Sequence, residues 1–159
     1  MASRPSDQES TAEVDDQFRA LLEGLRTTIP GVMVLFAFLL TVPLYSTFAD
    51  LRGLDKVVFY LAFSFATLSA ILLIAASVHQ RVRAPVSGIR RRTMSHVLFA
   101  TKMAIVGTVT FAFSIIAVVY LVSTLVFTDL PAAIATAVVA AITTWAWFYV
   151  PLVEFRGMD

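Results

Sequence analysis

The stretch at residues 103–128, MAIVGTVTFAFSIIAVVYLVSTLVFT, decides the fold of this chain. It holds 26 residues without a formal charge, although Lys102 directly precedes it and Asp129 directly follows it. A membrane hydrocarbon core about 30 Å thick needs roughly 20 helical residues at 1.5 Å each, whereas apolar runs of about 10–14 residues are typical of buried soluble helices. The stretch is therefore predicted to cross a membrane as a helix.

Three further runs without formal charge are long enough to cross a membrane. They are residues 27–49, 57–78 and 130–153, with 23, 22 and 24 residues respectively. Their apolar residues lack the strict alternation of a transmembrane β-strand, and a helix satisfies its backbone polar groups within one segment. The sequence therefore predicts an all-α fold, a membrane four-helix bundle over residues 27–153. The predicted spans are about residues 28–49, 57–78, 97–127 and 131–152.

The composition of the whole chain agrees with a membrane location. Of 159 residues, 58% are hydrophobic and 14% are charged, and the mean hydropathy is +0.83. Soluble domains have about 25% charged residues, so these values exclude a soluble domain and also a disordered chain. The chain has no cysteine and a net charge of only +1, so it is predicted to have no disulfide, no thiolate site and no nucleic-acid partner.

The basic residues predict the orientation of the spans. Ten of the twelve Lys and Arg residues lie before the first charge-free run, between the second and third, or after the fourth. Only Arg52 and Lys56 lie in the other connections. Because cytoplasmic loops carry an excess of Lys and Arg, the N terminus, the loop at 79–96 and the C-terminal tail at 154–159 are expected to be cytoplasmic.

Residues 1–26 precede the first span and divide into two parts. Residues 1–9 are mostly polar and are predicted to form a disordered tail. From Ser10, which can form a capping box with Glu13, apolar side chains recur at helical spacing and predict an amphipathic helix over 10–26. This cytoplasmic or interfacial helix is expected to lie on the membrane, dock on the bundle or bind a partner.

Few ionisable side chains fall near the apolar depth of the predicted bundle. His79 ends the second span, His96 lies at the start of the third, and Lys102 lies about one turn inside it. These three are candidates for a proton, substrate or metal role, although histidines at an interface face headgroups and a lysine there extends to water. No catalytic, cofactor-binding or metal site is predicted, because a catalytic zinc normally needs three protein ligands. The predicted contacts to anionic lipid headgroups are Arg81, Arg83, Arg90, Arg91 and Arg92.

Small residues recur at every fourth position in three spans. Helices in lipid associate where small residues let their backbones approach, so these stripes are predicted to hold the bundle together. The fourth span carries two adjacent stripes, and the second of them is available for another protomer. The stripes are Ala62, Ala66 and Ala70; Ala100, Ala104, Thr108 and Ala112; and Ala132, Thr136, Ala140 and Thr144 beside Ala133, Ala137 and Ala141.

Prolines predict local structure at two ends of the spans. Pro43 is expected to kink the outer half of the first helix, because it removes one backbone hydrogen bond. Thr128 or Asp129 is expected to cap the fourth helix, with Pro131 tolerated in its first turn.

Mostly apolar motifs lie in the first two spans and after the first. They are GVMVLFAFLLTVP at residues 31–43, Phe48 and Leu51, and the segments 60–61 and 79–81. Together they resemble a family of small bacterial four-span proteins of unknown function, mostly from actinobacteria, over roughly residues 26–120. The resemblance implies four spans in the bacterial plasma membrane and carries no activity, so it assigns no functional residue.

These observations lead to one principal hypothesis and one alternative, besides a third hypothesis of a membrane redox protein with a haem held by His79. The principal hypothesis is a multi-pass protein without a catalytic site or cofactor, acting as a structural or accessory subunit of a membrane assembly. Its expected partners are a bilayer with anionic headgroups, and a second copy or another membrane protein. The alternative is a small oligomeric channel or transporter for ions or small solutes, with a path lined by Ser and Thr side chains.

Overall fold

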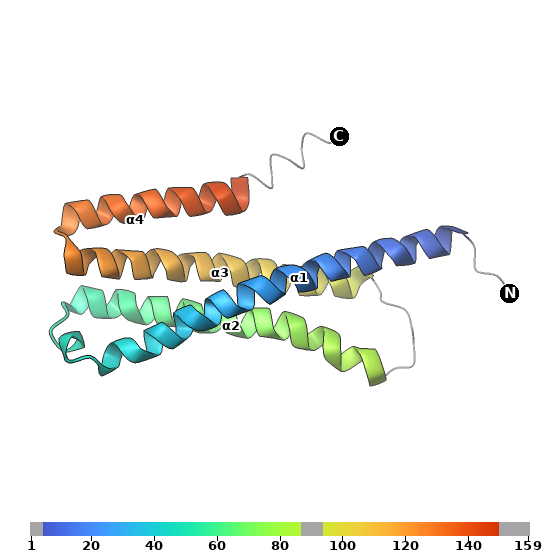
Figure 1. The fold of residues 1–159 in the computed structure, drawn as a ribbon, viewed down its shortest axis with the longest axis horizontal. Coiled ribbons are helices and arrows are strands. Elements are labelled where there is room, and N and C mark those ends of the chain that lie inside the picture. The colour runs from blue at the N-terminus through green and yellow to red at the C-terminus, as the bar shows by residue number, and fades with distance from the viewer. Residues whose placement is uncertain (1–4, 87–93, 150–159) are drawn as a thin grey trace. The chain divides into compact units, whose positions relative to one another are not determined.

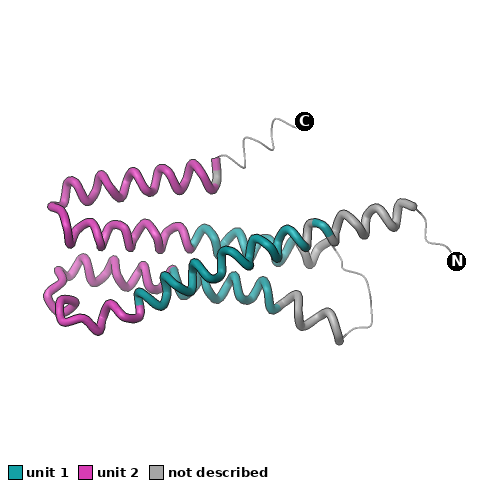
Figure 2. The backbone as a smooth tube through the Cα atoms, in the orientation of Figure 1, with its two compact units in different colours: residues 1–39, 66–110 teal, residues 40–65, 111–159 magenta. Residues whose placement is uncertain are grey.

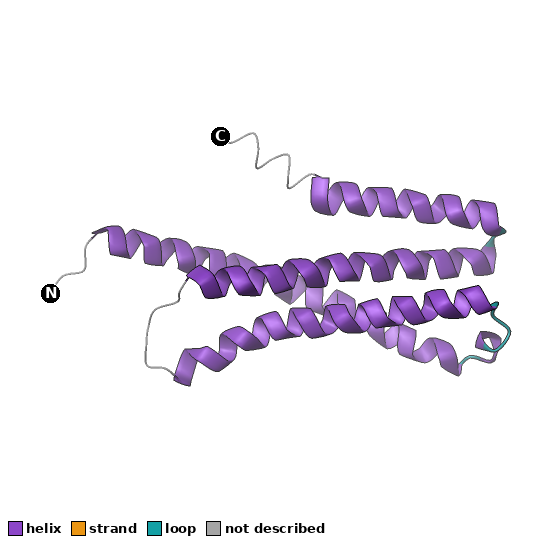
Figure 3. Cartoon of the chain, turned by 180° about the vertical axis from the view of Figure 1, so that it is seen from behind, coloured by secondary structure: helices purple, strands orange, loops and turns teal. Residues whose placement is uncertain are grey.

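The computed structural model describes residues 5–86 and 94–149, which form four long helices (Figure 1). Helix α1 is Pro5–Thr41, α2 is Gly53–Val86, α3 is Met94–Val126 and α4 is Asp129–Thr144. Short 3₁₀ turns, η1 (Val42–Leu44) and η2 (Ser46–Phe48), follow α1, and a π-helical segment, η3 (Trp145–Tyr149), follows α4. Within these ranges the chain contains no strand, and the predicted all-α four-helix arrangement is confirmed (Figure 3).

Each of the four helices contains a segment that is long and apolar enough to cross a membrane. The segments begin and end at Arg19–Leu44, Gly53–Val78, Leu98–Val126 and Asp129–Trp147. The second and third overlap the predicted spans at 57–78 and 97–127, although the second begins four residues earlier, at Gly53, ahead of Asp55 and Lys56. The chain is therefore a membrane protein with four candidate spans.

The first span differs from its prediction at both ends. Helix α1 is continuous over 37 residues, so it begins inside the expected disordered tail at 1–9 and joins the expected amphipathic helix to the span. No helix-breaking feature separates the two, and Thr27 and Thr28 each donate a side-chain hydrogen bond of 2.9 Å to the Gly24 carbonyl. Pro30 lies inside the same helix, where it removes the backbone N–H that would otherwise bond to the carbonyl of Arg26.

Pro43 ends α1 instead of kinking it. The α-helix stops at Thr41, and Pro43 lies in η1. A proline disfavours helical conformation in the residue before it, and the chain then turns through a Tyr45 N–H bond of 3.2 Å to the Val42 carbonyl. The predicted kink is therefore wrong, and the candidate span ends at Leu44 instead of continuing to residue 49.

The described helices contribute to two compact units (Figure 2). Unit 1 contains residues 1–39 and 66–110, and unit 2 contains residues 40–65 and 111–159. In both units the buried side chains of α2 follow one another at steps of three and four, which is the spacing of helices packed at a shallow crossing angle. These α2 residues are Phe59 and Ala62 in unit 2, and Ala66, Ser69, Leu73 and Ala76 in unit 1.

The packing of unit 1 depends on close approach between α2 and α3. Ser69 is fully buried and its hydroxyl donates a hydrogen bond of 2.8 Å to the carbonyl of Gly107. A Cβ atom placed on Gly107 would lie 2.9 Å from Leu73 Cγ. Any side chain at position 107 would therefore force the two helices apart or displace Leu73.

Unit 2 repeats this arrangement between other parts of the same helices. Ser114 of α3 is fully buried and donates a hydrogen bond of 2.8 Å to the carbonyl of Ala62 in α2. Phe111 of α3 also stacks on Trp147 of η3, with ring centroids 6.1 Å apart. Buried hydroxyls thus bond across helices in both units, where hydrocarbon would leave them unsatisfied.

The predicted small-residue stripes pack in α2 and α3 but hardly at all in α4. In α4, only Ala132 is buried, and the adjacent stripe that begins at Ala133 is exposed. The buried members of the other two stripes are Ala62, Ala66, Ala100, Ala104 and Ala112. The prediction is therefore confirmed for α2 and α3, and α4 keeps most of its surface outward.

Candidate functional site

Two ion pairs made by Arg52 link the start of α2 to the first turn of α4, both within unit 2. The Arg52 guanidinium donates from Nε to Asp55 Oδ2 at 2.9 Å and from Nη1 to Asp129 Oδ1 at 3.1 Å. We call these three residues the Arg52 cluster. One planar guanidinium thus ties together two carboxylates that lie 74 positions apart in the chain.

The connection before α2 holds Arg52 at the start of that helix. The Phe48 ring packs edge-on against Phe59, with ring centroids 5.0 Å apart. Lys56 Nζ donates a hydrogen bond of 2.8 Å to the carbonyl of Ala49, and the Lys56 N–H donates one of 3.1 Å to the carbonyl of Arg52. Side chains of α2 therefore hold the connection at Phe48 and Ala49, just before Arg52.

Asp55 is the buried member of the cluster. It is only 4% exposed, and its Oδ1 has no hydrogen-bond partner among the described residues. Its place in the first turn of α2 is favourable for a carboxylate, because the N-terminal end of a helix carries partial positive charge. Arg52 is thus the principal compensation for a buried negative charge.

The other two members of the cluster are open to solvent or headgroups. The side chains of Arg52 and Asp129 are 54% and 81% exposed. Hydrogen bonds to Asp55 and Asp129 raise the pKa of Arg52 above its ordinary value, so its charge persists at all ordinary pH values. The cluster is suited to hold helix ends together, since an always-protonated guanidinium cannot exchange a proton during a reaction.

The start of α4 differs from its predicted capping. Thr128 is the residue before the helix, but its side chain makes no capping hydrogen bond. Asp129 occupies the first turn and its carboxylate accepts from Arg52. The Ala132 N–H instead bonds to the Thr128 carbonyl at 3.2 Å, and Pro131 lies in the first turn as predicted.

The residues that the sequence singled out are not brought into one described site. Lys102 lies in α3, exposed and about two turns from its start. His79, Arg81 and Arg83 in α2 and His96 in α3 occupy helical positions, but their side chains lie outside the described part of the chain. The headgroup candidates Arg90, Arg91 and Arg92 lie outside the described residues altogether.

Sequence reasoning missed the Arg52 cluster as a site. The opposite charges of Arg52 and Asp55 at a spacing of three residues were a local signal, because residues three apart are neighbours on a helix. Nothing local connects either residue with Asp129. Among the described residues, no group of three or more His, Asp or Glu side chains could hold a metal ion.

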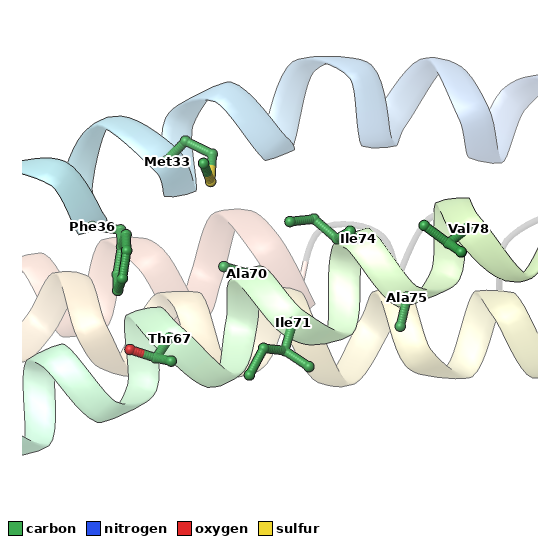
Figure 4. A pocket seen from close by; sticks show the side chains of 8 residues that line it. All are labelled: Met33, Phe36, Thr67, Ala70, Ile71, Ile74, Ala75 and Val78. Atoms are coloured by element: carbon green, nitrogen blue, oxygen red, sulfur yellow. The ribbon is translucent and has the colours of Figure 1, made fainter.

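Unit 1 contains a different feature, an apolar groove between α1 and α2. Its volume is about 490 Å³, and seven of its eight lining side chains are hydrocarbon or thioether. Figure 4 shows that Met33 extends from α1 toward α2. The lining residues are Met33 and Phe36 of α1, and Thr67, Ala70, Ile71, Ile74, Ala75 and Val78 of α2.

Comparison with known proteins gives one match. A family model described as a family of unknown function, DUF6328, matches residues 7–151. No curated protein and no solved structure matches the chain. The family match covers far more of the chain than the predicted resemblance over residues 26–120 and includes part of each of the four helices. The chain therefore belongs to the DUF6328 family of unknown function.

Proposed function

We propose that this protein is a non-enzymatic structural or accessory subunit of an assembly in the bacterial plasma membrane. The observation that carries the proposal is the difference in cover between the helices. In the most apolar stretch of each span, 28% of the residues are buried in α2 but only 6% in α4. Helix α4 thus offers a long face that no other part of the described chain covers.

The chemistry of this uncovered face favours a protein neighbour over lipid alone. Ala133, Ala137 and Ala141 are exposed along it, beside the larger Ile134 and Val138. Transmembrane helices associate by close packing at small residues, and a stripe of methyl groups lets a second helix approach more closely than large side chains do. The partner we propose is a transmembrane helix of another subunit or of a second copy.

The hydroxyl side chains support a structural role over a channel. The hydroxyls of Ser69 and Ser114 donate hydrogen bonds to carbonyls of the facing helix. Thr108, Thr110 and Thr136 instead donate to carbonyls four residues earlier in their own helices. A hydroxyl that bonds within a helix or at a closed interface offers little to a passing solute.

A photo-crosslinking experiment tests the proposed partner face. The chain has no native cysteine, so Ala137→Cys in α4 and Leu68→Cys in α2 each give one labelling site, and both positions are exposed. With a thiol-linked benzophenone in native membranes, we expect Ala137→Cys to yield a discrete adduct to an integral membrane protein or a second copy, and Leu68→Cys to yield lipid adducts. Equal adduct patterns for the two variants would contradict the proposal.

The proposed orientation places both chain termini and the α2–α3 connection in the cytoplasm. It predicts that a membrane-impermeant maleimide labels Thr47→Cys in intact cells but labels Ser87→Cys only after the membrane is permeabilised. The physical reason is the excess of basic residues on the side of Ser87. Labelling of Ser87→Cys in intact cells, with Thr47→Cys protected, would reverse the orientation.

A further inference from the structure

We propose that the contact between Arg52 Nη1 and Asp129 Oδ1 is a releasable latch, and that α4 turns away from α2 about Thr128 when this contact opens. The inference concerns how α4 is held to its own chain, so it stands whether or not a partner covers the exposed face of α4. All the residues that carry it belong to unit 2. It makes the position of α4 sensitive to the ionic conditions at this end of the helices.

The two ion pairs of Arg52 differ in what their loss would leave behind. The pair with Asp55 Oδ2, at 2.9 Å, compensates a carboxylate whose side chain is 6% exposed. The pair with Asp129, at 3.1 Å, joins side chains that are 54% and 81% exposed, and such exposed pairs contribute little to stability and are screened by salt. When Asp129 leaves, Arg52 stays on Asp55 and no buried charge loses its partner. The second pair can therefore open while the first stays closed.

Little of α4 is packed against the rest of the described chain. Ala132 is the one buried residue between Asp129 and Thr144. Thr136 donates its hydroxyl hydrogen bond of 2.8 Å to the Ala132 carbonyl in its own helix, so this bond does not join α4 to a neighbour. Lipid tails are as apolar as the side chains of α4, so no hydrophobic force holds the helix against α2 and α3. Its attachment therefore depends strongly on the side-chain contacts at its two ends.

The connection between α3 and α4 provides the pivot. Helix α3 ends at Val126 and α4 begins at Asp129. Between them, Thr128 has an extended backbone with φ −69° and ψ 168°, and its side chain makes no capping hydrogen bond. Hinges are formed by a few such residues at the ends of elements. At the far end, Trp147 stacks on Phe111 with ring centroids 6.1 Å apart, an apolar contact that lipid chains can replace.

The separation of two spin labels tests the latch. The chain has no native cysteine, so Leu61→Cys in α2 with Ile142→Cys in α4 gives one labelled pair at exposed positions. With one full-length chain in each lipid nanodisc, we expect double electron–electron resonance to show a shorter and a longer separation. Raising the salt from about 50 mM to about 500 mM should increase the longer population, because salt screens the exposed pair. A distribution that does not respond to salt would overturn the proposal.

A pair of matched variants assigns the effect to Asp129. Asp129→Asn removes one charge of the latch and should raise the ratio of longer to shorter separations by about two- to fivefold, the effect of one exposed ion pair. It should also abolish the response to salt. Asp50 is an exposed carboxylate that makes no ion pair with the described residues, so Asp50→Asn should behave as the parent does. Equal opening in both variants, or unchanged separations in Asp129→Asn, would contradict the latch.

Asp129→Glu distinguishes loss of the ion pair from damage to the start of α4. It keeps a carboxylate in the first turn, at a position where the side chain is largely exposed and a longer one has room. We expect this variant to keep the shorter separation and the response to salt. Circular dichroism checks that every variant retains its helix content. If a folded Asp129→Glu variant opened as fully as Asp129→Asn, the charge of Asp129 would not hold α4 and the proposal would fail.

Discussion

A Gly107→Leu variant is expected to lose about 3 kcal/mol of unfolding free energy, at the upper end of the roughly 1–3 kcal/mol typical of overpacking. A Cβ at this position would lie 2.9 Å and 3.0 Å from Leu73 Cγ and Cδ2, and 3.4 Å from Leu72 Cβ. The hydrogen bond of 2.8 Å from Ser69 to the Gly107 carbonyl opposes any separation of α2 from α3. The added side chain therefore fits only if it displaces Leu73 or separates α2 from α3.

The control for this prediction is the same substitution at Gly24. A Cβ on Gly24 would meet no atom within 4 Å, so Gly24→Leu should raise stability by up to about 1 kcal/mol through helix propensity alone. Unfolding of the detergent-solubilised protein by heat or by increasing dodecyl sulfate measures both variants. If the cost comes from contact with Leu73, adding Leu73→Ala to a Gly107→Ala variant should restore part of the stability that Gly107→Ala alone loses. Equal stability of the two leucine variants would refute it.

An Arg52→Ala variant is expected to lower the unfolding temperature more than Asp129→Ala or Lys56→Ala. It leaves the buried Asp55 carboxylate, whose Oδ1 already has no partner, without its donor at Oδ2 as well. Removing one partner of a buried ion pair is more costly than never having the pair. Asp129→Ala should have a smaller effect, because the Asp129 side chain is 81% exposed and its loss leaves no buried charge.

Two further variants separate the cluster from a general effect of charge. Lys56→Ala removes the same charge from the same turn and a single bond to the Ala49 carbonyl, so its unfolding temperature should fall less. The double variant Arg52→Ala with Asp55→Ala should recover part of the loss, because no buried carboxylate remains. Thermal unfolding of the full chain measures all four variants. If Lys56→Ala were as damaging as Arg52→Ala, the special role of the cluster would be disproved.

The extent of agreement between sequence and structure differs from element to element. The candidate span Leu98–Val126 overlaps the predicted span at 97–127, whereas the end of α1 was misplaced because Pro43 stopped the helix instead of bending it. The small residues of α2 and α3 were predicted to pack, and they do. The small-residue stripes of α4 remain largely exposed, because the spacing of small residues does not specify which helix packs against them.

By itself, the sequence determined that the chain is helical and has four segments long and apolar enough to cross a membrane. These conclusions follow from local properties, since hydrocarbon tolerates few charges and leaves a helix as the structure that satisfies its own backbone. Only the tertiary structure decided that Arg52 ties Asp55 to Asp129, that Gly107 is closed by Leu73, and which side chains line the groove. Apart from the Arg52–Asp55 pair, those contacts join residues far apart in the chain, and helix periodicity does not specify the rotation at which two helices meet.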